Sequence, residues 1–276
     1  RTTSAATAAQ IICLGNAISS IIYTTGGTAT GAGVTGLPAG LNGIFSGGIF
    51  TISGIPTAAG SFNFTITTTG TCTAVTATGT LNVNQPTIAP VSLAASQVLI
   101  CNGSASTISQ VGGTAGTGAV WKWYTDAAYI NFVGNGTGAA ASLSVSPTVT
   151  TTYYVRAEGG ATPCTGTVAG PVAGVTVSVR QLSANPVSAS SSANNFCPGA
   201  SAILTLTGGG GGGAGESIAW YSGSCGGMLV GTGNNLVVFP TVTTTYFGRY
   251  QNAAPCNYNT TCVAVTININ TGGTWL

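Results

Sequence analysis

Hydrophobic and polar residues alternate in short runs along the whole chain. The segments "FTISGIP", "SFNFTITTTG", "SLSVSPT", "TTYYVRAEG" and "VAVTININ" show this pattern, and clusters of Gly, Pro and Asn separate them. A period of two is typical of a strand with one buried face, and such clusters mark turns. No window shows the 3.6-residue period of an amphipathic helix with caps. The sequence therefore predicts an all-β protein.

An internal repeat divides the chain. The heptapeptide PTVTTTY stands at residues 147–153 and again at residues 240–246. Other landmarks keep nearly the same spacing: Trp123 matches Trp220, Cys101 matches Cys197 and Cys164 matches Cys256. Two homologous modules therefore follow one another. The first 85 residues lack the heptapeptide but carry their own strand-and-turn pattern, which predicts a third sandwich of a different subtype.

Two Pro-containing polar links predict the domain boundaries. In "NVNQPTIAP" and "SVRQLSANP" a strand ends and a short link follows, which places boundaries near Gln85 and Gln181. We therefore expect three tandem, disulfide-stapled immunoglobulin-like β-sandwich domains: residues 1–85, 86–181, and 182–276 with a C-terminal tail. Short links of this kind favour a stiff connection between modules.

The composition removes most catalytic chemistry. Charged residues make up 3% of the chain, histidine is absent, and the three carboxylates, Asp126, Glu158 and Glu216, are scattered. General acid–base catalysis and metal hydrolysis thus lack their usual groups, so we expect no enzyme, no catalytic residue, no cofactor and no metal site. A net charge of +2 without a basic cluster argues against nucleic acid as a partner. Low net charge also favours self-association.

Eight cysteines are spread along the chain without CxxC pairs. Because zinc sites need such pairs or histidines, we interpret the cysteines as disulfides, which indicate an extracellular setting. The expected pairs lie within modules: Cys13 with Cys72, Cys101 with Cys164, and Cys197 with Cys256. Cys225 and Cys262 most simply pair with one another. The four cysteines of the third module allow three pairings, and an intermolecular bond through Cys225 or Cys262 is the alternative.

Four aromatic residues occupy repeated positions. Trp123 and Trp220 are predicted core residues of two sandwiches, and Tyr153 and Tyr246, which end the heptapeptide, are predicted to fix a corner of the fold. A sugar-binding platform is the alternative role for the tryptophans. Trp121 should share a face with Trp123, two residues away. Trp275 and Leu276, in the tail "TGGTWL", have no core of their own to enter and are candidate interface residues.

Several of these segments resemble a known class of modules. The block "GLPAG" with "ISGIPTAAGSFNFTITTTG" resembles Ig-like repeats of very large surface proteins of Bacteroidota, and "WYTD…GTG…LSVSPTVTTTYYVRAEG" and "CPGAS…WYSGSCGG" resemble their Ig- or PKD-like modules. The resemblance covers nearly the whole chain. It implies a secreted, surface-attached adhesin or filament component, exported by the type IX route.

The expected function is therefore structural. We expect a subunit or segment of an extracellular filament or cell-surface adhesin that assembles end to end or by strand addition, with other copies of itself as partners. No stretch is long and apolar enough to span a membrane, and the start at Arg1 is expected to be that of a mature or excised segment. The alternative is an array of carbohydrate-binding modules with surface glycans as partners, which would need a line of exposed aromatic side chains.

Overall fold

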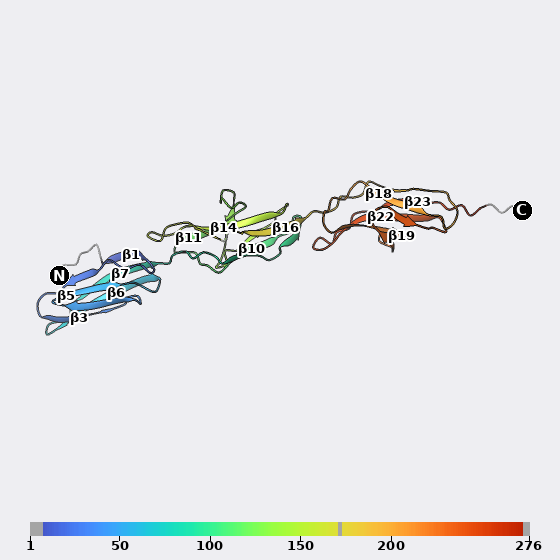
Figure 1. Cartoon of the computed structure of the whole chain (residues 1–276). Coiled ribbons are helices and arrows are strands. Elements are labelled where there is room, and N and C mark those ends of the chain that lie inside the picture. The colour runs from blue at the N-terminus through green and yellow to red at the C-terminus, as the bar shows by residue number, and fades with distance from the viewer. Residues whose placement is uncertain (1–7, 171–172, 273–276) are drawn as a thin grey trace. The chain divides into compact units, whose positions relative to one another are not determined.

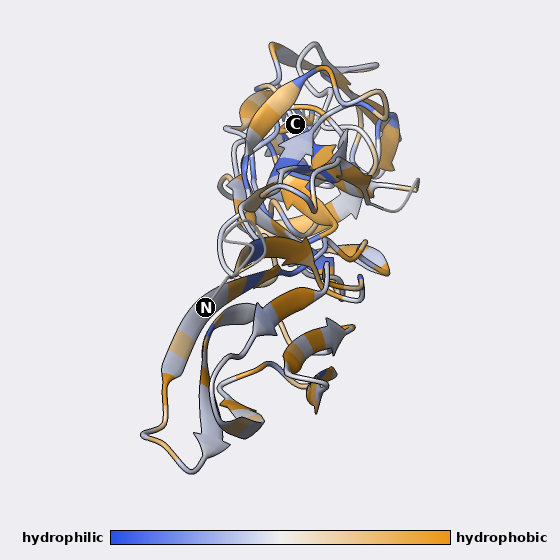
Figure 2. Cartoon of the chain, turned by 90° about the vertical axis from the view of Figure 1, so that its left-hand side faces the viewer, coloured by the Kyte–Doolittle hydropathy of each residue, from blue (hydrophilic) through white to orange (hydrophobic). Residues whose placement is uncertain are grey.

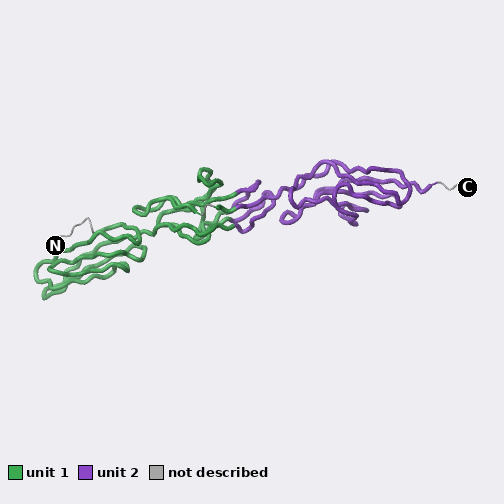
Figure 3. The backbone as a smooth tube through the Cα atoms, viewed as in Figure 1, with its two compact units in different colours: residues 1–94, 108–143, 152–175 green, residues 95–107, 144–151, 176–276 purple. Residues whose placement is uncertain are grey.

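A computed structural model describes residues 8–170 and 173–272, and none of these residues lies in a helix. The strands β1 to β23 follow one another along the chain (Figure 1). The chain divides into two compact units (Figure 3). Unit 1 comprises residues 1–94, 108–143 and 152–175, and unit 2 comprises residues 95–107, 144–151 and 176–276. The predicted all-β class is confirmed.

The first module, residues 8–85, forms two sheets in unit 1, with strand orders β1-β7-β6-β3 and β2-β5-β4. β1 runs parallel to β7, and the other pairs are antiparallel. Alternating side chains, among them Phe50, Phe64 and Leu81, are buried in one core cluster. The strands are β1 (Ala9–Cys13), β2 (Ile21–Thr24), β3 (Ala29–Thr35), β4 (Leu41–Ser46), β5 (Ile49–Gly54), β6 (Gly60–Gly70) and β7 (Thr76–Asn84).

The middle module, residues 86–181, contributes strands to both units. In unit 1, β11 pairs with β12 and β14, and β14 with β15. In unit 2, β9 runs parallel to β16. The strands are β8 (Ser92–Ala95), β9 (Leu99–Cys101), β10 (Ser106–Val111), β11 (Ala119–Tyr124), β12 (Phe132–Asn135), β13 (Leu143–Val145), β14 (Thr151–Gly159), β15 (Val168–Ala169) and β16 (Val175–Arg180).

The third module, from residue 182, lies in unit 2. Its two sheets have the strand orders β17-β18-β21 and β20-β19-β22-β23. Leu204, Trp220 and Ile267 are the most buried side chains of its core cluster. The strands are β17 (Ser188–Ser191), β18 (Ala202–Thr207), β19 (Glu216–Ser222), β20 (Met228–Thr232), β21 (Leu236–Val238), β22 (Thr244–Asn252) and β23 (Val263–Ile267). The predicted boundaries, near Gln85 after β7 and Gln181 after β16, stay a prediction.

The two repeated modules share local details that the heptapeptide alone does not show. Trp123 and Trp220 are both fully buried, and each donates its indole N–H to a carbonyl in a neighbouring loop, at 2.7 Å to Ala141 and 3.1 Å to Gly233. In both modules the strand register shifts directly after the tryptophan. Within each heptapeptide the fifth residue donates its hydroxyl to the third carbonyl, at 2.7 Å from Thr151 and 2.8 Å from Thr244.

The ribbon is pale to hydrophobic along most of its length, with few strongly hydrophilic segments (Figure 2). This follows from the composition, in which hydroxyl residues and glycine take the places that charged residues usually fill. Within residues 8–170 and 173–272, no helix is long and apolar enough to cross a membrane.

The buried tryptophans give a test of the repeated core. Replacing Trp123 or Trp220 by Ala removes a fully buried ring, so each variant should lose about 3–5 kcal/mol from the unfolding free energy of its own module. Met228, 74% exposed, provides a control, because Met228→Ala should change stability by no more than about 0.5 kcal/mol. Denaturant unfolding of the full chain, followed by circular dichroism, measures the difference. Equal losses in all three variants would contradict the assignment.

Candidate functional site: disulfides at the ends of the modules

Three disulfides link the cysteines in a pattern that differs from the predicted one. Cys13 is bonded to Cys164, Cys101 to Cys256 and Cys225 to Cys262. Cys72 and Cys197 are free and exposed. The pairs expected within modules, Cys13 with Cys72, Cys101 with Cys164 and Cys197 with Cys256, are therefore wrong. The expected pair Cys225–Cys262 is present.

Strand direction explains the correction. β1 runs parallel to β7 and places Cys13 opposite Asn84, the last residue of β7, whereas Cys72 precedes the first residue of that strand. A strand of this length spans about 30 Å, and a disulfide needs Cα atoms within about 7 Å. The third module repeats the arrangement, because the parallel bridge between Phe196 and Ile269 lies beyond β23 and Cys256 precedes β23. In the first and third modules, the two cysteines of the predicted pair thus lie at opposite ends of the module.

We name these two ends by what they carry. The linker end is where the last strand runs into the next linker, at Asn84 in the first module, Arg180 in the middle module and Asn270 in the third. The loop end carries two loops of each module. The first loop connects β2 to β3 in the first module, β10 to β11 in the middle module and β18 to β19 in the third. The second loop follows β6, β14 and β22, respectively. Each long disulfide joins a linker-end cysteine to a loop-end cysteine of the following module.

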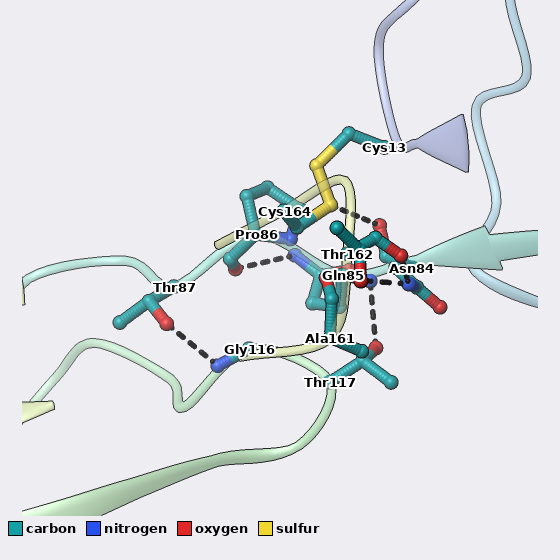
Figure 4. Close-up of a disulfide and its surroundings, with 10 residues drawn as sticks. All are labelled: Cys13, Asn84, Gln85, Pro86, Thr87, Gly116, Thr117, Ala161, Thr162 and Cys164. Atoms are coloured by element: carbon teal, nitrogen blue, oxygen red, sulfur yellow. Dashed lines mark hydrogen bonds between the residues drawn. A yellow bond between two sulfur atoms is a disulfide. The ribbon is translucent and has the colours of Figure 1, made fainter. Parts of the chain in front are cut away.

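Hydrogen bonds surround the first of these disulfides (Figure 4). Cys13 and Cys164 have Cα atoms 5.4 Å apart, and the Cys164 Sγ lies 3.3 Å from the Asn84 carbonyl oxygen. Asn84 is buried, and its side-chain amide donates a hydrogen bond to the Thr162 carbonyl oxygen at 2.9 Å. Leu14 N–H donates to the Asn84 carbonyl at 2.9 Å. The end of β7 is thereby held on the loop that carries Cys164.

The second disulfide has the same surroundings. Cys101 and Cys256 have Cα atoms 5.0 Å apart, and the Cys256 Sγ lies 3.9 Å from the Arg180 carbonyl oxygen. The Arg180 guanidinium donates to the Ala254 carbonyl at 2.6 Å, as the Asn84 amide donates to Thr162. Asn102 N–H donates to the Arg180 carbonyl at 2.9 Å. Asn84 and Arg180 thus hold equivalent positions, and sequence reasoning identified neither.

Each linker also pairs with a loop of the module that follows it. Ile88 exchanges two backbone hydrogen bonds with Thr114, at 2.9 and 3.0 Å, and Ala184 does the same with Gly210, at 2.8 and 2.9 Å. Ile88 and Ala184 each stand four residues after the linker-end residue of the preceding module. The glycine run 208–213 is therefore the loop that receives the second linker.

Two glycines in these loops are required by the close approach of the linker. Gly113 and Gly209 have φ of +72° and +71°, values that other residues rarely adopt. A Cβ atom at either position would lie 2.7 Å from a linker carbonyl oxygen, that of Ile88 for Gly113 and that of Ala184 for Gly209. Any side chain at these positions would push the linker away.

A separate charged cluster lies on β11 and β14 of the middle module. Lys122 Nζ contacts Glu158 Oε2 at 2.9 Å, and Arg156 Nε donates to Glu158 Oε1 at 2.9 Å. The Tyr124 hydroxyl also donates to Glu158. The Arg156 guanidinium packs over the ring of Tyr129, 4.8 Å from its centroid. These hydrogen bonds, from Tyr124 first and then from Lys122 and Arg156, lower the pKa of Glu158 to about 2.

The other predicted residues are placed as follows. Tyr153 and Tyr246 are buried, and Trp121 is buried together with Trp123. That the two tyrosines fix a corner of the fold stays a prediction. Trp275 and Leu276 lie outside the described residues. Within the described part of the chain, no group of three or more His, Cys, Asp or Glu side chains could hold a metal ion. Asp126 instead accepts the backbone N–H of Asn131 at 2.6 Å, and this hydrogen bond lowers the pKa of Asp126.

Comparison with known proteins identifies the type of fold. A family model described as "Ig-like domain CHU_C associated" matches residues 184–270. A search of curated proteins finds no match. Among solved structures, the D1–D4 ectodomain fragment of ICAM-5 is similar at a TM-score of 0.56 and 9% identity, over 98% of this chain and 76% of that one.

Two further structures are similar over nearly their full length. The titin I-band fragment I67–I69 matches at a TM-score of 0.44 and 12% identity, over 96% of both chains. The mouse nectin-like molecule 4 ectodomain matches at a TM-score of 0.42 and 12% identity, over 97% of this chain and 99% of that one. The similarity to the ICAM-5 fragment, together with the sheets and disulfides of this chain, identifies a disulfide-stapled array of three tandem Ig-like β-sandwiches, as predicted. Disulfide-bonded Ig-like domains are typical of extracellular proteins and generally serve as structural or adhesive modules.

The disulfide pattern gives the second prediction. Mass spectrometry of a non-reduced digest should recover peptides that join Cys13 to Cys164, Cys101 to Cys256 and Cys225 to Cys262. The thiols should be kept blocked throughout, so that exchange does not scramble the bonds. A peptide that joins Cys13 to Cys72 would refute the arrangement, because these residues lie at opposite ends of the first module.

The charged cluster around Glu158 predicts how stability depends on pH. Because the pKa of Glu158 is lower in the folded chain than its ordinary value of 4.5, folding stability should fall as the pH falls from about 4.5 toward 2. The contribution of this partly exposed cluster should be about 1 kcal/mol. Glu158→Gln should be less stable than wild type at pH 7, and the two should converge near pH 2 in thermal unfolding. A difference independent of pH would argue against the ionised Glu158 as its cause.

Proposed function

We propose that this chain is a structural segment of an extracellular filament or cell-surface adhesin, in which covalent bonds across the module junctions limit how far the chain extends under load. The observation that carries the proposal is the pair of disulfides Cys13–Cys164 and Cys101–Cys256, each of which joins one module to the next. A bond within a module stabilises that module alone. A bond between modules also fixes the junction.

The geometry of each junction supports this role. The linker is paired in backbone hydrogen bonds with a loop of the next module, and a side chain at the linker end donates to a carbonyl beside the bonded cysteine. Chain-entropy estimates for loops of 151 and 155 residues give about 5 kcal/mol for each long disulfide. Both junctions therefore resist opening more than hydrogen bonds alone would.

The disulfides also shorten the covalent path along which tension passes. From residue 1 the shortest path reaches Cys13, crosses to Cys164, follows the chain to Cys225, crosses to Cys262 and ends at residue 276. At about 3.5 Å per residue this path is about 300 Å long, against about 960 Å for the reduced chain. Even with every module unfolded, the oxidised chain would reach only about a third of its full contour.

Among the described residues, the tryptophans give no support to the carbohydrate-binding alternative. Trp121, which that function would need at the surface, is 4% exposed, and Trp123 and Trp220 are fully buried. We also propose that the chain is extracellular, that it is attached to a surface and that other copies of the chain are its partners. The three disulfides are consistent with an oxidising compartment.

Single-molecule force spectroscopy on the chain pulled from its termini tests the proposal. The oxidised protein should stop extending at about 300 Å, and reduction should raise this limit to about 960 Å. The double variant Cys13→Ser with Cys164→Ser should extend to about 420 Å, because tension then passes through Cys101–Cys256. The matched variant Cys101→Ser with Cys256→Ser should keep the limit of about 300 Å. An oxidised chain that extends to its full contour would refute the proposal.

A further inference from the structure

The two free cysteines occupy the positions that form disulfides elsewhere in the chain. Cys197 follows Phe196, which bridges Ile269 in parallel, so Cys197 stands at the linker end of the third module as Cys13 and Cys101 stand at theirs. Cys72 lies in the loop after β6, at the loop end of the first module, as Cys164 follows β14 and Cys256 follows β22. Both free cysteines are exposed. The chain thus carries one unpaired linker-end cysteine and one unpaired loop-end cysteine.

The loop end of the first module has the features that receive a linker in the other two. Its loop between β2 and β3 contains Gly26 and Gly27, a Gly-Gly pair like Gly112-Gly113 and Gly208-Gly209. At Gly113 and Gly209 a Cβ would collide with a linker carbonyl, whereas at Gly26 and Gly27 no described atom lies within 4 Å of the Cβ position. No residue that the structure describes fills the space that a linker backbone occupies elsewhere.

A pocket lies beside this space. It has a volume of about 430 Å³, and its walls come from the loop between β2 and β3, the loop after β6 and the core side chains Phe50 and Ile66. Cys72 is part of its lining. The pocket is therefore apolar inside and has a free thiol at its margin, where the neighbouring modules have a disulfide.

We propose that this loop end docks the linker end of a second copy of the chain, with a disulfide between Cys197 of one copy and Cys72 of the next. The inference rests on the proposed structural function and names its partner and its bond. Residues 271 and 272, which follow Asn270 of the first copy, would take the course of residues 85–86 and 181–182.

The bond requires an oxidant, which we identify as a disulfide such as oxidised glutathione. The two thiols form one disulfide and pass two electrons and two protons to glutathione disulfide, which leaves as two thiols. The contact joins different surfaces of the two copies, so it can repeat along a line. The resulting polymer would have the same junction between copies as within each copy.

Two single-cysteine variants test the pairing. Oxidised wild-type chain at high concentration should form covalent species at multiples of 26.9 kDa on non-reducing gels, and reduction should return them to monomer. Cys72→Ser keeps only the thiol of Cys197, and Cys197→Ser keeps only that of Cys72. Each variant alone should stay monomeric, whereas an equimolar mixture should give a covalent dimer. Thiol titration of each variant should find one free thiol, which shows that the three internal disulfides are intact.

The outcomes separate this inference from the proposed function. No dimer in the mixture, or as much dimer from either variant alone, would overturn the Cys197–Cys72 junction, while the extension limit of about 300 Å would still hold for the single chain. The single-chain force measurement does not depend on either result.

Discussion

The arrangement of this chain depends on the parallel pairing of a short cysteine-bearing strand with the last strand of its module. This pairing, seen for β1 on β7 and for β9 on β16, places the cysteine beside the point where the chain leaves the module. In the first module the second cysteine, Cys72, follows β6 and lies about a strand length away, beyond the reach of a disulfide. A cysteine beside the exit of its module therefore bonds to the next module, as Cys13 and Cys101 do, or stays free, as Cys197 does.

Close approach of backbone at each junction explains part of the unusual composition. Gly113 and Gly209 leave room for a linker carbonyl that any side chain would displace. With 3% charged residues, the chain has few charged groups to hold modules together. Five of its eight charged side chains lie in the middle module, and three of these form the Glu158 cluster. At the junctions, backbone hydrogen bonds and disulfides provide the polar contacts that charged side chains at the rim provide in many protein interfaces. Such contacts depend little on salt.

Much of the fold could be predicted from the sequence because its signals are local. Alternation of side chains predicts the strands, and the repeated heptapeptide fixes equivalent positions such as Trp123 and Trp220, which are both buried. The disulfide pairing could not be predicted, because an even number of cysteines limits how many disulfides can form but does not show which cysteines lie close together. The direction of β1 against β7 has no sequence signature, and it decides which end of the module Cys13 occupies. Asn84 and Arg180 were missed for a related reason: they differ in type and share only their position.

The two long disulfides enclose overlapping parts of the chain. One loop runs from Cys13 to Cys164 and the other from Cys101 to Cys256, so residues 101–164 belong to both. Unfolding of the middle module is consequently restrained from both sides, since its ends remain bonded to the modules before and after it. In an array joined only by peptide linkers, a module that unfolds adds its full length to the chain. Here the same event adds little, because tension bypasses most of the released segment through sulfur. In the proposed structural role, the overlap supplies a second covalent route, because tension would pass through Cys101–Cys256 if Cys13–Cys164 were lost.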